Sequence, residues 1–460
     1  MTKIEIVCFY SFLLLVIWLP IPLASNRVWA WSIFEVWIAL QTLALIFSVR
    51  THFPWQRLKR FLWLLLPLIL FQVWIAIQII PLPDPLLNVI SPSAFRIYSF
   101  LNLESKTISL DWFATVSGLL KGVAYTLFTF NAIILINSIK RIKQVILAVV
   151  FSGTLQAFYA ALMILTASTQ SWVFGLPQGS RATGSFVYHN HLANYLIMTL
   201  SLGIGLIVSQ MHQSESGSWQ VRFRRWFEAI LSPKMIIRLC LVVMVIALVM
   251  TRSRMGNTVF FSITIIGGLV ALFFYKNKPR ALTALVISFL IIDTLAVGTI
   301  FGLDKVKERL ENTAMSTETR DQAVLWSMDI IKDYPLTGTG LGSFYSTFPS
   351  YSQYNIGYYD FAHNDYIQFA AEVGIPAVLV LGCMVLIGLW FSFNAMRTRN
   401  SRILKGTALG CFMAIIGMLI HITVDFNLQA PANAATFLLV LVLAGCTRVI
   451  KSTVVSKPIQ

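Results

Sequence analysis

The chain has 460 residues, of which 57% are hydrophobic and only 12% charged, and its mean hydropathy is +0.75. Soluble globular proteins carry about 25% charged residues. The composition therefore excludes a soluble enzyme, a nucleic-acid-binding domain and a disordered scaffold. Apolar residues arrive in runs of about 20, the length that crosses a hydrocarbon core of about 30 Å. We expect an all-α polytopic membrane protein.

The apolar segments predict about twelve transmembrane helices within a single integral membrane domain, 1–460. They are 5–23, 28–49, 61–80, 113–137, 144–166, 186–210, 236–251, 255–275, 281–301, 374–396, 403–424 and 430–449. The first segment is longer than the 7–15 apolar residues of a signal peptide, so we expect an uncleaved anchor. All five cysteines fall inside predicted spans, which argues against a disulfide framework or a metal site.

The net charge of +16 is interpreted as a topology signal. If the N-terminus is cytoplasmic, every inner loop is basic, as the positive-inside rule requires, and the C-terminus is cytoplasmic too. The inner loop near 211–235 carries Arg222, Arg224 and Arg225, which we interpret as orientation charges on a flexible linker. A nucleic-acid partner is not expected.

The longest connection, 302–373, holds ten acidic and five basic residues, which predicts a large loop on the extracytoplasmic side before span ten. The resemblance described below makes this side the periplasm. Val324, Leu325, Met328 and Ile331 recur at helical spacing and predict an amphipathic helix. Pro335 should end this helix, and Gly338-Thr-Gly-Leu-Gly342 predicts a bend. Long loops that contain their own helix are usually functional.

The most polar part of this loop is Tyr359-Asp-Phe-Ala-His363-Asn364-Asp365-Tyr366. A histidine at the membrane surface can act as a general base because its unperturbed pKa is about 6.5. Asn364 or Asp365 can orient its ring. The alternative is a histidine that caps the following helix or is simply solvated.

Arginine is unexpected in the outer loops. Arg252 and Arg254 lie in a tight turn between spans seven and eight, and Arg181 lies in the glycine-flanked approach to span six. Near hydrocarbon, inserting an arginine costs about 2.5–3.5 kcal/mol on membrane-insertion scales. A bound partner is therefore expected, and phosphate matches the planar guanidinium group. Snorkelling to the interface is the alternative.

Two further polar groups lie at span ends. His189-Asn190-His191 begins span six, but histidines at i and i+2 face different sides of a helix, which is poor metal geometry. His421 and Asp425 are predicted to share one face of span eleven, as a hydrogen-bonded pair or as part of a cavity wall.

Nine aromatic residues lie between Phe344 and Tyr366. Their flat apolar faces suit sugar rings, but aromatic residues also form the ordinary belt at a membrane interface. Both interpretations stand.

Together these stretches resemble the O-antigen ligase/O-antigen polymerase superfamily of bacterial membrane glycosyltransferases, over about 180–430. The matching motifs are Arg181-Ala-Thr-Gly-Ser-Phe…Asn190-His-Leu-Ala, Thr251-Arg-Ser-Arg254, Pro335-Leu-Thr-Gly-Thr-Gly-Leu-Gly-Ser-Phe344, Ala362-His-Asn-Asp-Tyr-Ile-Gln-Phe…Glu372-Val-Gly-Ile-Pro376 and His421…Asp425-Phe-Asn-Leu-Gln. One departure is Tyr188-His189, where the family pattern has Asn-Pro.

The resemblance implies a GT-C-like fold and an inverting, metal-independent transfer, without cofactor, at the periplasmic face of the bacterial inner membrane. A glycan would pass from an undecaprenyl-pyrophosphate carrier to an acceptor hydroxyl, with lipid A-core as the acceptor of a ligase. The prenyl tail would lie between spans, among membrane lipids. By resemblance, His363 is the base, Arg181, Arg254 and Arg320 bind pyrophosphate, and Asn364, Asp365, Asn190 and Asp425 support them. Arg320 can also pair with neighbouring Asp321 as an ordinary salt bridge.

Two other functions stay open. A polymerase that joins repeat units on the same carrier would use the same motifs. A membrane transporter is the alternative of another class, but the polar residues concentrate in one outer loop and its neighbours, and paired, broken spans in two halves are not evident.

Overall fold

The computed structural model describes residues 2–211, 233–278, 283, 287 and 314–451. Their helices are α1 (Lys3–Trp18), η1 (Leu23–Ser25), α2 (Val28–Val49), α3 (Trp55–Arg60), α4 (Leu62–Gln78), α5 (Asp84–Ile90), α6 (Pro92–Phe100), α7 (Trp112–Leu135), α8 (Ile139–Leu165), α9 (His189–Gln210), α11 (Pro233–Met250), α12 (Arg254–Phe274), α15 (Ala314–Asp333), α16 (Phe344–Thr347), η2 (Phe348–Tyr351), α17 (Asp365–Val373), α18 (Ile375–Thr398), α19 (Arg402–His421), η3 (Asn427–Gln429) and α20 (Pro431–Val449). Predicted span 281–301, the inner-loop residues Arg222, Arg224 and Arg225, and the start of the large loop, 302–313, lie outside the described residues.

Each of the other predicted spans coincides with a helix. Eight of these helices, α2, α7, α8, α9, α12, α18, α19 and α20, are long and apolar enough to cross a membrane. The apolar helix α4 and the apolar part of α11 are shorter, and α1 has 16 residues. The chain is thus a multi-pass helical membrane protein, and the number of twelve spans stays a prediction.

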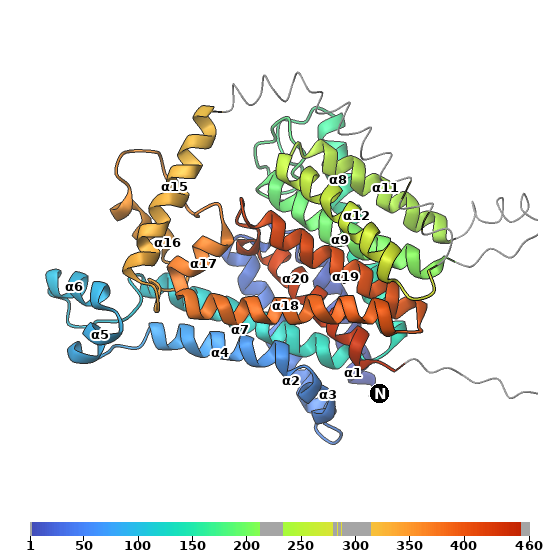
Figure 1. Ribbon diagram of the computed structural model, residues 1–460, viewed down its shortest axis with the longest axis horizontal. Helices are drawn as coiled ribbons and strands as arrows, with labels where there is room; N and C mark the ends of the chain where they lie inside the picture. The colour runs from blue at the N-terminus through green and yellow to red at the C-terminus, as the bar shows by residue number, and fades with distance from the viewer. Residues whose placement is uncertain (1, 212–232, 279–282, 284–286, 288–313, 452–460) are drawn as a thin grey trace, which may run out of the picture.

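The centre of the bundle is built by α9, α19 and α20, whose apolar windows are 94%, 78% and 89% buried, against 17% for the outer helix α18 (Figure 1). Helices α9 and α19 meet through glycines. A Cβ added to Gly205 would lie 2.2 Å from the Gly406 carbonyl oxygen, and a Cβ on Gly410 would lie 2.8 Å from the Ser201 carbonyl oxygen. Small residues let helix backbones approach closely in membranes, and here they position α9 directly against α19.

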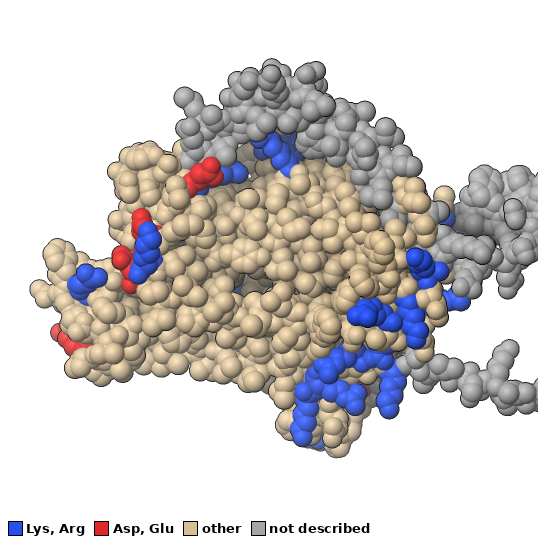
Figure 2. All heavy atoms as spheres, viewed as in Figure 1, with Lys and Arg blue, Asp and Glu red and all other residues tan. Residues whose placement is uncertain are grey.

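Acidic and basic residues are distributed differently between the two ends of the molecule. Lys and Arg gather at the right of Figure 2, where α3, the α7–α8 turn and the end of α20 meet and Arg57, Arg60, Lys140 and Lys451 line one hollow. The Asp and Glu visible in this view lie toward the left, near α15 and α5 of Figure 1. We call these the basic end and the loop end.

A second hydrophobic cluster forms the loop end, where α15, α16, η2 and α17 pack with α5 and α6. Helix α15 buries Ala323, Trp326 and Ile330. The predicted apolar stripe was therefore wrong, because Leu325 and Met328 are 53% and 42% exposed. Ala323, Trp326 and Ile330 also follow helical spacing, and burying the large indole ring removes the most apolar area from water.

The glycine-rich bend holds α17 in place. Gly338 and Gly340 have φ values of +64° and +104°, and a Cβ at Gly338 would lie 2.2 Å from the backbone of Glu372. The Gly340 amide donates to the Glu372 carbonyl at 2.9 Å, and Gln78 Nε2 of α4 donates to the same oxygen at 3.0 Å. Because only glycine fits this approach at positive φ, the bend fixes α17 against α4.

Candidate active site

His363 directly precedes α17, at the loop end. The next residue, Asn364, caps this helix: its side-chain oxygen accepts hydrogen bonds from the amides of Tyr366 and Ile367 at 3.0 and 3.2 Å. The Asn364 side-chain nitrogen donates to the Thr423 carbonyl at 2.9 Å. His363 itself has a φ of +53°, which is unusual for a residue with a Cβ. Packing must therefore hold its backbone in this conformation.

Asp365 connects the His363 segment to residues 422–430, which we call the return turn. Its buried carboxylate accepts hydrogen bonds from the Leu428 amide at 2.8 Å and from Gln429 Nε2 at 3.3 Å. Its amide donates to the carbonyls of Ile422 and Asp425 at 3.0 and 3.2 Å. Burial raises the pKa of Asp365 well above its ordinary value. The return turn is thereby fastened to the start of α17.

The imidazole of His363 packs between aromatic rings. Its centroid lies 5.6 Å from that of Tyr359 and 4.9 Å from that of Phe426, both edge-to-face. Burial, with a smaller contribution from the positive charge of Arg320, lowers the pKa of His363 to about 4. The ring is thus neutral at pH 7, which is the state that can accept a proton.

Arg320 belongs to α15 and is exposed. Its charge acts on His363 and on Asp425. Burial raises the pKa of Asp425 to about 6, and the Asn190 side chain hydrogen-bonds to its carboxylate. The structure therefore brings four predicted site residues from four segments into one place.

Arg181 and Arg254 belong to a neighbouring part of the loop end. Arg181 Nη1 lies 3.1 Å from His189 Nε2, and both Arg181 and Arg320 act electrostatically on His189. The amide of Ala182 donates to the Met250 carbonyl at 3.0 Å, which joins the Arg181 segment to the turn before α12. Arg254 is the exposed first residue of α12.

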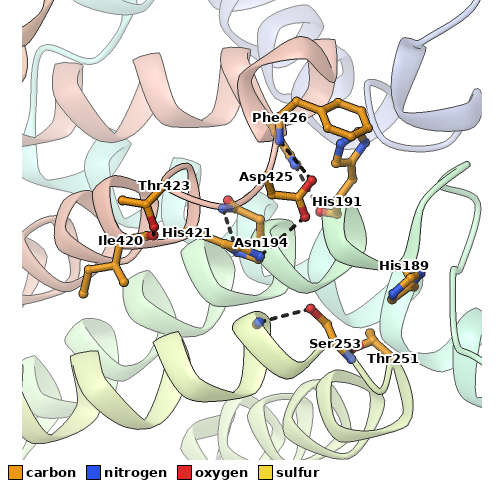
Figure 3. A network of polar contacts seen from close by, with 12 residues as sticks. His189, His191, Asn194, Thr251, Ser253, Ile420, His421, Thr423, Asp425 and Phe426 are labelled. Atoms are coloured by element: carbon orange, nitrogen blue, oxygen red, sulfur yellow. Dashed lines mark hydrogen bonds and ion pairs between the residues drawn. The ribbon is translucent and has the colours of Figure 1, made fainter. Parts of the chain in front are cut away.

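A buried polar network joins α9, the end of α19 and the return turn, and it was only partly predicted (Figure 3). Asn194 Nδ2 of α9 lies 3.1 Å from His421 Nδ1, and His421 Nε2 lies 3.9 Å from Asp425 Oδ2. His421 and Asp425 pair as predicted, but they do not share a helix face, because α19 ends at His421 and Asp425 lies in the return turn. Asn194 was missed, although a lone amide inside an apolar span signals a functional position.

Several atoms of this network have no hydrogen-bond partner among the described residues. They include His191 Nε2, Asn194 Oδ1, His421 Nε2 and Asp425 Oδ2. A buried polar atom left without a hydrogen bond costs about 1–3 kcal/mol. Groups of such atoms are normally completed by ordered water or by a substrate. These buried atoms therefore retain unused capacity for hydrogen bonds.

Residues 239–382 match the family model described as O-Antigen ligase. The matched segment contains Arg254, Arg320, His363, Asn364 and Asp365, whereas Arg181, Asn190 and Asp425 lie outside it. No curated protein matches the chain. Within a multi-pass helical fold, this segment thus resembles the O-antigen ligase/O-antigen polymerase superfamily.

Proposed function

We propose that this protein transfers a glycan from undecaprenyl pyrophosphate to an acceptor hydroxyl, and that it acts as a ligase with lipid A-core as the acceptor. The match of residues 239–382 to the O-antigen ligase family model supports ligase or polymerase activity. The observation that carries the proposal is the His363 imidazole packed between Tyr359 and Phe426, within electrostatic range of Arg320. Arg181 and the Arg254 turn lie at the same end of the bundle.

The charge distribution supports a periplasmic site. Basic residues are retained on the cytoplasmic side of bacterial membranes, so we assign the basic end to the cytoplasm of a cell with an inner membrane. The N-terminus lies at this end, because Thr2 is hydrogen-bonded to Ser48 at the end of α2. Helix α20 also ends there, next to Lys451. The loop end, with His363, then faces the periplasm.

These positions support the following reaction. His363 accepts the proton of the acceptor hydroxyl as its oxygen attacks the anomeric carbon of the glycan. The bond from that carbon to the pyrophosphate oxygen breaks, and its electron pair leaves with the pyrophosphate. Attack opposite the leaving group inverts the anomeric configuration. Arg320, Arg181 and Arg254 stabilise the leaving group, since pre-placed guanidinium groups bind developing phosphate charge without reorganisation.

Donor binding also prepares the base. In the free protein Arg320 helps to lower the pKa of His363 to about 4, which makes the imidazole a weak base. A bound pyrophosphate would offset the charge of Arg320 and raise the pKa of His363, since a nearby negative charge favours the imidazolium. The base therefore becomes stronger when the donor is in place. Asn364 and Asp365 keep the ring segment in position, and Asn190 orients Asp425.

An apolar cavity in the bundle supports the binding of a lipid tail. A cavity of about 260 Å³ is lined mainly by apolar side chains of α4, α7, α17, α18, α19 and α20, and it reaches Asp365 and Tyr366 of α17. Phe71, Phe369 and Phe437 are among its walls. We assign part of the prenyl tail to this cavity, because buried apolar area is the main source of affinity for a hydrocarbon chain.

Reconstitution tests the proposal. Purified protein in lipid vesicles is given the lipid-linked glycan of its source bacterium and the acceptor lipid, and glycan-bearing acceptor is followed by gel and mass spectrometry. Replacing His363 with Ala should lower the transfer rate by about 10²–10⁴-fold, the usual contribution of a general base. His52→Ala is the control, because His52 lies at the basic end and its side chain is 53% exposed. Near-native transfer by the His363 variant would overturn the assignment.

Gene deletion separates the ligase from the second candidate. Loss of a ligase leaves long glycan chains that are not attached to lipid A-core. Loss of a polymerase leaves acceptors that carry a single repeat unit.

A further inference from the structure

A cleft at the loop end lies outside the site described above. It has a volume of about 430 Å³ and belongs to the segment between α16 and α17. Its walls are Tyr345, Phe348, Pro349, Ser352, Tyr354, Asn355, Gly357, Tyr358 and Tyr359. Small-molecule sites occupy about 300–1,000 Å³, so the cleft is large enough for an organic ligand.

The floor of the cleft is rigid because it is part of the second hydrophobic cluster. Phe348 is 2% exposed, stacks on Phe344 with centroids 5.1 Å apart, and contacts Trp326 of α15. Trp326 also meets Tyr354 edge-to-face at 4.9 Å. Rings that are held before binding lose little freedom when a ligand arrives. This part of the cleft is therefore preorganised.

The rim of the cleft has a different character. Tyr345, Tyr354 and Tyr358 are 55%, 57% and 92% exposed. Their rings alternate with the hydrogen-bonding side chains of Ser352 and Asn355. Apolar faces beside polar edges match a ligand of the same pattern, which is the pattern of a sugar ring with its C–H faces and equatorial hydroxyls.

The absence of charged residues from the cleft limits the chemical class of its ligand. Residues 343–359 contain no Asp, Glu, Lys or Arg. The cleft therefore offers no counter-ion for a phosphate or a carboxylate, in contrast to the arginine-rich region around His363. An uncharged part of the substrate fits it best.

The cleft is continuous with the candidate active site through one residue. The ring of Tyr359 contacts Phe348 at 6.0 Å within the cleft and His363 at 5.6 Å outside it. Along α15, Trp326 lies six residues beyond Arg320, or about 9 Å at the rise of an α-helix. A ligand in the cleft is thus within a short distance of both His363 and Arg320.

We propose that the cleft binds the glycan of the donor, one or more sugars away from the pyrophosphate. This inference rests on the proposed function and adds a carbohydrate subsite to it. Tyr354 and Tyr358 supply the stacking faces, and Ser352 and Asn355 supply hydrogen bonds to sugar hydroxyls.

The test measures binding without catalysis. Donor glycan is released from its carrier by mild acid, so that it has neither lipid nor pyrophosphate, and its affinity for the purified protein in nanodiscs is measured by saturation-transfer NMR titration. The double variant Tyr354→Ala, Tyr358→Ala should bind about tenfold more weakly, because two stacking faces are lost. Tyr354→Phe, Tyr358→Phe keeps the rings and should bind within about twofold of the wild type. Tyr10→Ala, which removes a 56% exposed tyrosine on α1, is the matched control.

Three outcomes decide the matter. Lost binding in the double alanine variant, with binding retained in His363→Ala, supports the subsite even if reconstituted transfer were to fail. Unchanged glycan affinity in the double alanine variant overturns it. Binding of released acceptor core sugar at the cleft, with none for donor glycan, overturns it as well, because the tyrosines would then serve the acceptor.

Discussion

The imidazole of His363 and the ring of Phe426 meet edge-to-face with their centroids 4.9 Å apart, at an interplanar angle of 80°. Phe426 is 4% exposed, stacks on Phe361 at 4.6 Å, and receives His191 of α9 edge-to-face at 4.8 Å. The return turn thus supplies a ring that holds His363 in its left-handed backbone conformation and shields it from water.

This contact predicts the effect of Phe426→Leu. Water should reach the imidazole, so the pKa of His363 should rise toward its ordinary value of about 6.5. The fall of kcat/KM at low pH, its acid limb, should then move to higher pH. Transfer at pH 7 should fall by about tenfold, because the His363 ring is less well placed. Phe128→Leu, at an equally buried ring of α7, should reduce thermal stability without moving the limb. An unchanged limb in Phe426→Leu would remove this residue from the positioning of His363.

A second prediction concerns the wild-type protein. kcat/KM reports the free protein, and kcat reports the donor complex. Because the base must be neutral, kcat/KM should fall as the pH drops through about 4, the pKa of His363 without donor. The corresponding limb of kcat should lie at higher pH, since pyrophosphate offsets Arg320. Initial rates at saturating and limiting donor over this range measure both limbs, and coincident limbs would contradict the coupling.

Arg320→Gln removes one charge near His363. The pKa of His363 should rise, because the guanidinium helps to lower it. The acid limb of kcat/KM should therefore shift upward, while the rate at pH 7 should fall by about 10²-fold through loss of a leaving-group contact. Lys332→Gln removes the same charge from the end of the same helix, where the side chain is 75% exposed and paired with Asp329. An equal effect of both variants would show that only the net charge of α15 matters.

Filling the apolar cavity should weaken donor binding. Gly382 of α18 lines the cavity, and a Cβ added there meets no atom within 4 Å, so Gly382→Leu should fold normally. Its side chain should displace part of the prenyl tail and raise the donor KM by about tenfold, with kcat retained. A donor with a short prenyl tail should show no penalty. Leu386→Phe adds bulk to the 58% exposed surface of the same helix and should leave KM unchanged.

Removal of divalent metal ions should not change the rate. If Arg320, Arg181 and Arg254 provide the positive charge for the leaving group, EDTA leaves initial rates as they are. The measurement is a titration of EDTA followed by added Mg²⁺. Strong inhibition that Mg²⁺ reverses would contradict the assignment of these three arginines to the leaving group.

Sequence patterns predicted most helices because their signals are local. Hydropathy runs located α2, α7 and α18 to within a few residues, and Pro335 follows closely on the end of α15 at Asp333. The apolar stripe of α15 was predicted wrongly because a local pattern does not decide which face of a helix is buried. Val324, Leu325, Met328 and Ile331 satisfy helical spacing as well as Ala323, Trp326 and Ile330 do, and only the neighbouring elements decide which face is buried.

The sequence by itself determined that this is a helical membrane protein, which end is basic, and which histidine and arginines are candidates, because composition and motifs act over a few residues. The tertiary structure decided how they meet. Arg320, His363 and Asp425 converge only because glycine contacts join α9 to α19 and because Asp365 fastens the return turn to α17. Contacts between residues far apart in the chain depend on packing, and no local pattern of residues encodes them.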